Sequence, residues 1–196
     1  MKLNLKQWQL PVWLAFLMAC NNQNADQTAT KDSTTTSTSN QPGATMDSSK
    51  RADSKDAQFV KEVVAGNIGE IKLAQLAEKK GSGKEVKDLG KMLEREHTAV
   101  LAELKSYAAR KNIDVPAEQD QDAKNTYNDF SKKSGKEFDK DWCDLMEKKH
   151  KAGISKFENL ANDPNADPEL KTLVNKTLPT LRTHLDHVMQ CKNKLK

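Results

Sequence analysis

Aromatic residues, glycine and proline are all scarce in this chain of 196 residues. Phe, Trp and Tyr together make up 5% of it, and there are only 8 Gly and 6 Pro. The period-two alternation of apolar and polar residues that marks β-strands is also missing. These absences argue against a turn-rich β-fold and favour an all-helical one.

Charge is plentiful but is not concentrated in blocks of one sign. Acidic and basic residues are intermixed, which leaves a formal net charge of +4. Nucleic-acid-binding domains usually cluster Lys and Arg and add aromatic residues, so we expect no nucleic-acid partner. The sequence also lacks a phosphate loop, zinc-finger spacing and a nucleophile elbow, and we assign no catalytic residue.

The chain has one long apolar run, Trp8–Ala19, which follows a basic start. About a dozen residues form the core of a signal peptide but cannot span a bilayer. The run ends at Leu17–Cys20, which resembles the bacterial lipobox, although Met18 departs from its usual residue. The motif implies lipidation of Cys20 and removal of residues 1–19. An ordinary secretory signal that contains a cysteine is the alternative.

The segment after the lipobox is almost devoid of large apolar residues. Residues 20–52 are mostly Ser, Thr, Asn, Gln, Ala and Asp, so they cannot offset the entropy lost on ordering. We interpret them as a disordered tether between the lipid and a domain at residues 53–196. The protein is thus expected in the bacterial envelope, on the periplasmic side of the inner or outer membrane or at the cell surface. Its expected partner is the membrane, through the lipid.

Apolar residues spaced by three and four predict four long helices and one short one within the domain. The long helices are expected at residues 55–80, 84–111, 136–162 and from 168 to the C-terminus, and the short one at 120–133. Asp167 suits a helix N-cap, and Pro168 suits the first helical position. Two helical hairpins joined by a longer connection predict an all-α four-helix bundle with a short extra helix in that connection.

The apolar stripe of each long helix contains one ionisable residue near its middle: Glu70, His97, His150 and His184. Glu70 and His97 are symmetric about the turn near residue 83, and His150 and His184 are symmetric about residue 167. Facing residues of an antiparallel hairpin have this symmetry, so each pair can meet in the core. The sequence does not define the height of one hairpin against the other.

Two cysteines share the register of the second hairpin. Cys143 lies seven residues before His150, and Cys191 lies seven residues after His184. With Cys20 lipidated, they form an even pair in an oxidising compartment. We predict a Cys143–Cys191 disulfide about two helical turns, roughly 10 Å, from the histidines. A pair of small buried thiols is the alternative.

A Glu and three His that converge in a core suit a transition metal such as Fe, Zn, Cu or Mn. Further candidate ligands are Glu94, Glu96, Glu147 and His187. Glu94 and Glu147 each begin a Glu-x-x-His pattern, which di-iron bundles carry on two helices. The match to that site is partial, because the last helix offers His184 where the pattern requires Glu. A purely structural polar cluster is the alternative.

Four segments carry a family resemblance: Phe59–Leu76 (FVKEVVAGNIGEIKLAQL), Val86–His97 (VKDLGKMLEREH), Glu137–Glu158 (EFDKDWCDLMEKKHKAGISKFE) and Leu178–His187 (LPTLRTHLDH). At these segments the chain resembles the family known as domain of unknown function 4142, ferritin-like proteins of the bacterial envelope. The family pattern matches Glu70, Glu96-His97, His150 and His184. The resemblance implies a ferritin-like bundle exported to the periplasm or outer membrane, and it implies no activity.

Three functions remain open on the sequence alone. The first is a membrane-tethered lipoprotein that binds a transition metal through the Glu and His cluster. The second is a structural or protein-interaction lipoprotein of the envelope with no ligand. The third is an oxidase or peroxidase-like enzyme, which requires a redox metal with an open coordination position, and the sequence demonstrates neither.

Overall fold

A computed structural model describes residues 54–195, and this part of the chain is entirely helical apart from its connections. Its helices are α1 (Ser54–Lys80), α2 (Lys84–Arg110), α3 (Gln121–Lys132), α4 (Gly135–Ala161) and α5 (Pro168–Lys194). The five predicted helices are confirmed, with ends that differ from the prediction by one or two residues. The predicted signal peptide, Cys20 and the tether lie outside the described residues.

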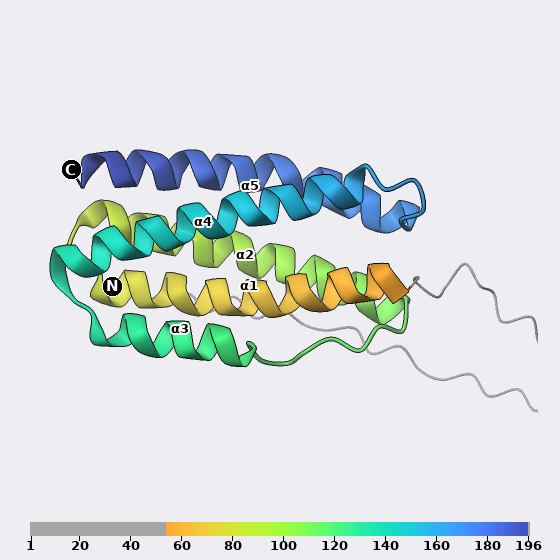
Figure 1. Ribbon diagram of the computed structural model, residues 1–196, viewed down its shortest axis with the longest axis horizontal. Helices are drawn as coiled ribbons and strands as arrows, with labels where there is room; N and C mark the ends of the chain where they lie inside the picture. The colour runs from red at the N-terminus through yellow and green to blue at the C-terminus, as the bar shows by residue number, and fades with distance from the viewer. Residues whose placement is uncertain (1–53, 196) are drawn as a thin grey trace, which may run out of the picture. The chain divides into compact units, whose positions relative to one another are not determined.

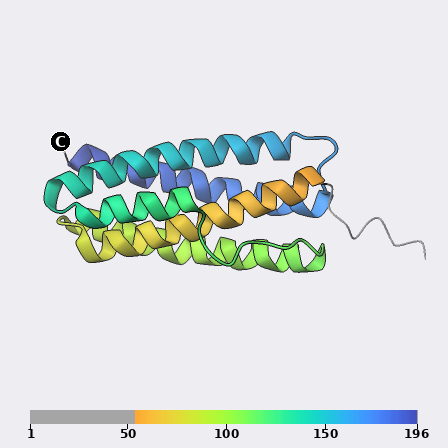
Figure 2. The ribbon, with the colours of Figure 1, turned by 60° about the horizontal axis from the view of Figure 1, so that its bottom comes forward.

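The four long helices form two antiparallel hairpins (Figure 1). α1 pairs with α2, α4 pairs with α5, and the hairpins pack on each other to make the predicted helical bundle. The connection between the hairpins contains α3, which lies alongside α1 (Figure 2). α2 and α5 pack closely, whereas α1 and α4 make fewer contacts. The packing of the two hairpins is therefore looser on the side of α1 and α4.

The turn of each hairpin is held by an aspartate from the other hairpin. Asp139 of α4 is buried and accepts hydrogen bonds from the backbone N–H groups of Ser82 and Gly83, both at 2.9 Å. At the other end of the bundle, Asp56 of α1 accepts the backbone N–H of Asp167 at 2.8 Å. These bonds set the relative height of the hairpins, which the sequence pattern left open.

Asp167 also acts as the predicted N-cap of α5. Its Oδ1 accepts the backbone N–H groups of Glu169 and Leu170, both at 3.0 Å. Pro168 occupies the first turn, where a missing N–H is harmless. The start of α5 is thus specified by local chemistry.

The apolar core divides into two clusters along the bundle. One contains Phe59, Leu104, Phe157 and Leu170, and the other contains Leu73, Leu93, Trp142 and Val188. The Trp142 indole N–H donates to the carbonyl of Leu73 at 3.0 Å, so this buried ring satisfies its polar atom while it joins α4 to α1. The predicted polar residues occupy helix positions between these two clusters.

The predicted disulfide is corrected by the structure. Cys143 and Cys191 do face each other between α4 and α5, as their shared register predicted, but both are free thiols. Their sulfur atoms lie 3.4 Å apart, a contact between thiols. A disulfide requires about 2.05 Å.

Within residues 54–195, no helix combines the length and the apolar character needed to cross a bilayer.

The Asp139 contacts predict a specific loss of stability. Asp139→Ala removes the acceptor of two backbone N–H groups, and we expect the free energy of unfolding to fall by about 2 kcal/mol. Urea denaturation measures this change. The control is Asp186→Ala, on an exposed position of α5, which should change stability by less than about 0.5 kcal/mol. Equal effects of the two substitutions would refute the role given to Asp139.

Candidate metal centre

Three histidines from three helices converge in the middle of the bundle. His97, His150 and His184 are all buried, at 4%, 2% and 0% exposure. The Nε2 atom of His150 lies 3.4 Å from Nε2 of His97 and 3.3 Å from Nδ1 of His184. One nitrogen of each ring could bind the same ion. The structure thus brings together the three core histidines that the sequence singled out.

The other nitrogen of each ring is held by an acceptor outside the cluster. Nδ1 of His97 lies 2.9 Å from Oδ1 of Asn67. Nδ1 of His150 lies 2.9 Å from the carbonyl of Met146, and Nε2 of His184 lies 2.8 Å from a carboxylate oxygen of Glu96. Carbonyl and carboxylate oxygens only accept hydrogen bonds, so each of these ring nitrogens must carry the proton.

The tautomers follow from these contacts. A neutral imidazole has one N–H and one lone pair. Because the outer nitrogens donate, the inner nitrogens of His97, His150 and His184 present lone pairs to one another. No hydrogen bond joins them in this state, despite distances of 3.3 and 3.4 Å. Three facing lone pairs repel each other unless a cation lies between them.

Glu70 adds a negative charge beside His97. Its Oε2 lies 3.4 Å from Nε2 of His97. Burial raises the pKa of Glu70, but His97, His150 and Lys149 outweigh burial and leave this pKa below its usual value. When the histidines are neutral, Lys149 is the cation that favours the ionised form of Glu70. Every group that faces the centre of the cluster is then an electron-pair donor.

Protonation of the histidines is disfavoured by their burial. Desolvation lowers the pKa of His97 to about 4, against the pull of Glu70. Desolvation also lowers the pKa of His184, although Glu96 opposes it. At neutral pH these two rings are neutral, and their inner lone pairs are available to a metal ion.

Two residues beside the histidines have roles that the sequence did not predict. Glu96 was a secondary candidate, and the structure places it behind His184, where it also accepts a hydrogen bond from Arg95 at 2.6 Å. Asn67 was missed, although it lies one turn before Glu70 on the same face of α1. Its amide donates to the carbonyl of Val63 at 3.4 Å, which orients the Oδ1 atom toward His97.

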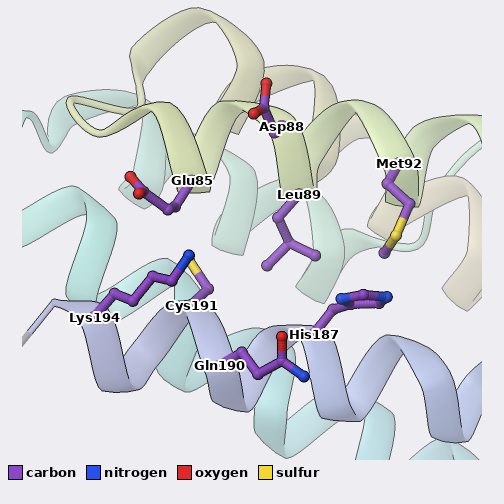
Figure 3. A pocket seen from close by; sticks show the side chains of 8 residues that line it. All are labelled: Glu85, Asp88, Leu89, Met92, His187, Gln190, Cys191 and Lys194. Carbon is purple, nitrogen blue, oxygen red and sulfur yellow. The ribbon is translucent and has the colours of Figure 1, made fainter.

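The other secondary candidates lie elsewhere. Glu94 accepts a hydrogen bond from Gln75 at 2.6 Å, and Glu147 pairs with Lys151 at 2.6 Å. His187 is exposed and lines a separate pocket between α2 and α5 (Figure 3). Because both Glu-x-x-His carboxylates have partners outside the cluster, the partial match to a di-iron site is not realised in these residues.

The sequence matches the family described as "Domain of unknown function (DUF4142)" over residues 40–191. The chain belongs to this family. No curated protein matches it. Among solved structures, a DUF305 fragment from Deinococcus radiodurans has a similar fold, with a TM-score of 0.65 at 12% identity. The similarity covers 74% of this chain and 99% of the fragment, and it concerns the fold alone.

The lowered pKa of His97 predicts that this DUF4142 protein loses stability in acid when no metal ion is bound. Between pH 6.5 and about 4 the unfolded chain binds a proton at His97 that the folded chain does not. Stability is therefore complete above pH 6.5 and decreases as the pH falls, by up to about 3 kcal/mol from this residue. Chemical denaturation with chelator present, at a series of pH values, measures the change. His97→Gln should flatten the profile, and an unchanged profile would contradict the assignment.

Proposed function

We propose that this protein binds one first-row transition-metal ion in the core of the bundle. The ligands are Nε2 of His97, Nε2 of His150, Nδ1 of His184 and a carboxylate oxygen of Glu70. The observation that carries the proposal is the convergence of three buried histidines, with the Glu70 carboxylate 3.4 Å from one of them. Three neutral imidazoles and a carboxylate form a donor set suited to Zn, Cu, Fe or Mn.

The spacing of the three histidine nitrogens supports a shared metal ion. With metal–nitrogen bonds of about 2.0–2.1 Å, neighbouring ligands of a tetrahedron lie about 3.3–3.4 Å apart. The histidine nitrogens fit this spacing, at 3.4 Å for His97–His150 and 3.3 Å for His150–His184. Glu70 lies 3.4 Å from His97 but does not belong to the group of ligand atoms that are all close together. An ion could bind among the three histidines as they stand, and the Glu70 side chain would turn toward it to become the fourth ligand.

The outer contacts are those of metal-binding histidines. A histidine ligand usually donates its second N–H to a carboxylate or a backbone carbonyl, which orients the ring. His184 does so with Glu96, and His150 does so with Met146. A cluster with only a structural role is a weaker explanation, because its facing lone pairs would remain uncompensated in the core.

The same proposal places the metal-binding bundle at a membrane. The lipobox at Leu17–Cys20 supports export and lipidation of Cys20, and the polar segment at residues 20–52 supports a tether. Two hairpins joined by a long connection resemble the ferritin-like arrangement. We therefore propose a ferritin-like lipoprotein of the bacterial envelope that handles a transition metal.

Metal affinity should depend on Glu96 and not on Glu94. Both carboxylates are on α2, but only Glu96 orients a histidine of the cluster. Glu96→Gln should weaken binding of Zn²⁺ or Co²⁺ about 10- to 100-fold, and Glu94→Gln should leave it unchanged. Calorimetric titration of the chelator-treated protein measures both constants. If neither the wild type nor the variants bind the ion, the metal site is refuted. If both variants lose the same metal affinity, the role of Glu96 is refuted.

Membrane attachment should depend on Cys20. Cys20→Ser removes the sulfur that would carry the lipid, so we expect the variant to leave the membrane fraction and to incorporate no labelled fatty acid. Fractionation and metabolic labelling measure the two effects. Cys191→Ser, in the bundle, is the matched control and should keep both properties. A variant at position 20 that still carries lipid would contradict the proposal.

A further inference from the structure

A cavity of about 220 Å³ lies beside the histidine cluster, between α1 and α4. Glu70, His97 and His150 form part of its lining. Exposed residues such as Glu62 and Lys156 also line it, so it opens to the surface. The cavity therefore reaches from solvent to three of the four proposed ligand residues, on the side where the hairpins pack loosely.

Two glycines leave this space empty. Gly66 of α1 and Gly153 of α4 both line the cavity, and a Cβ at either position would have no atom within 4 Å. Each lies inside a long helix, where glycine destabilises by roughly 0.5–1 kcal/mol relative to alanine. Neither glycine is required by a turn or by close packing of helices. Their effect is to keep a route open to the cluster.

The walls and the charges limit what the cavity can hold. Val63, Val100 and Phe157 make the sides apolar. Glu62 and Lys156 form an ion pair and neutralise each other. Lys149 also lines the cavity, lowers the pKa of Glu70, and has no ion-pair partner among the described residues.

A metal ion would make the cavity more positive. A divalent ion bound by three neutral imidazoles and one carboxylate keeps a net positive charge, and the Lys149 ammonium adds another. The carboxylate of Glu96 lies behind His184 and is paired with Arg95, so it does not face the cavity. A small monoanion would offset part of this positive charge and would fit inside the cavity.

We infer that the cavity is a binding site for a small monoanion that coordinates the metal ion directly and interacts with Lys149. The ligand class is that of azide: two or three heavy atoms, one negative charge and a lone pair for the metal. An open coordination position on the cavity side of the three histidines would accept it. This inference rests on the proposed metal site and adds the kind of ligand that the site takes.

The experiment uses the purified full-length protein loaded with Co²⁺, whose visible absorption reports coordination number. Titration with azide should change this spectrum in a saturable way. Gly153→Leu fills the cavity and should weaken azide binding at least about tenfold, while Co²⁺ affinity is retained. Gly153→Ala, which adds only one methyl group, should keep azide binding and raise stability.

Two further variants separate the cavity from general effects of substitution. Ala99→Leu adds the same side chain to an exposed position of α2 and should leave azide binding unchanged. Lys149→Gln removes the unpaired charge and should weaken azide binding about fivefold without loss of Co²⁺. Gly153→Leu tests whether azide reaches the metal through the cavity, and Lys149→Gln tests whether the ammonium group contributes to azide binding.

The outcomes distinguish the two proposals. A protein that binds no Co²⁺ refutes the metal site, and the anion site with it. A protein that binds Co²⁺ but shows no response to azide keeps the metal site and overturns the anion site. Equal azide affinity in wild type and Gly153→Leu also overturns it, because the anion would then reach the metal by another route.

Discussion

The convergence of lone pairs at the centre of the bundle is the constraint on which the rest of the site depends. His97, His150 and His184 each donate one N–H outward, so the opposite nitrogen of each ring must face inward without a proton. Glu70 adds a carboxylate beside His97. Such a group of donors is unfavourable in a buried core unless a cation compensates it. Neutral imidazoles and a metal ion satisfy this constraint together.

The architecture holds these four residues at one height. Each comes from a different long helix, so a shift of one hairpin by a single turn would separate them by about 5 Å. Asp139 and Asp56 prevent such a shift, because each binds the turn of the opposite hairpin at its own end of the bundle. The packing is nevertheless uneven, and the cavity lies where α1 and α4 make fewer contacts.

Much of the fold was predictable because helical periodicity is a local property. The helices begin and end close to the predicted residues, and symmetry about each turn placed His150 opposite His184 and Cys143 opposite Cys191. Proximity did not imply a bond, however, since the two sulfurs lie 3.4 Å apart as thiols. Glu94 illustrates a second limit: it has the spacing of a ligand, but its side chain binds Gln75.

The sequence by itself determined the helices, the facing residues within each hairpin and the presence of ionisable groups on apolar stripes, because these depend on spacing along the chain. Only the tertiary structure decided how the two hairpins meet, since the bonds of Asp139 and Asp56 join residues far apart in the chain. It also decided which nitrogen of each histidine faces the centre. That choice depends on acceptors such as Asn67 and Glu96, whose roles appear only once side chains from different helices are in contact.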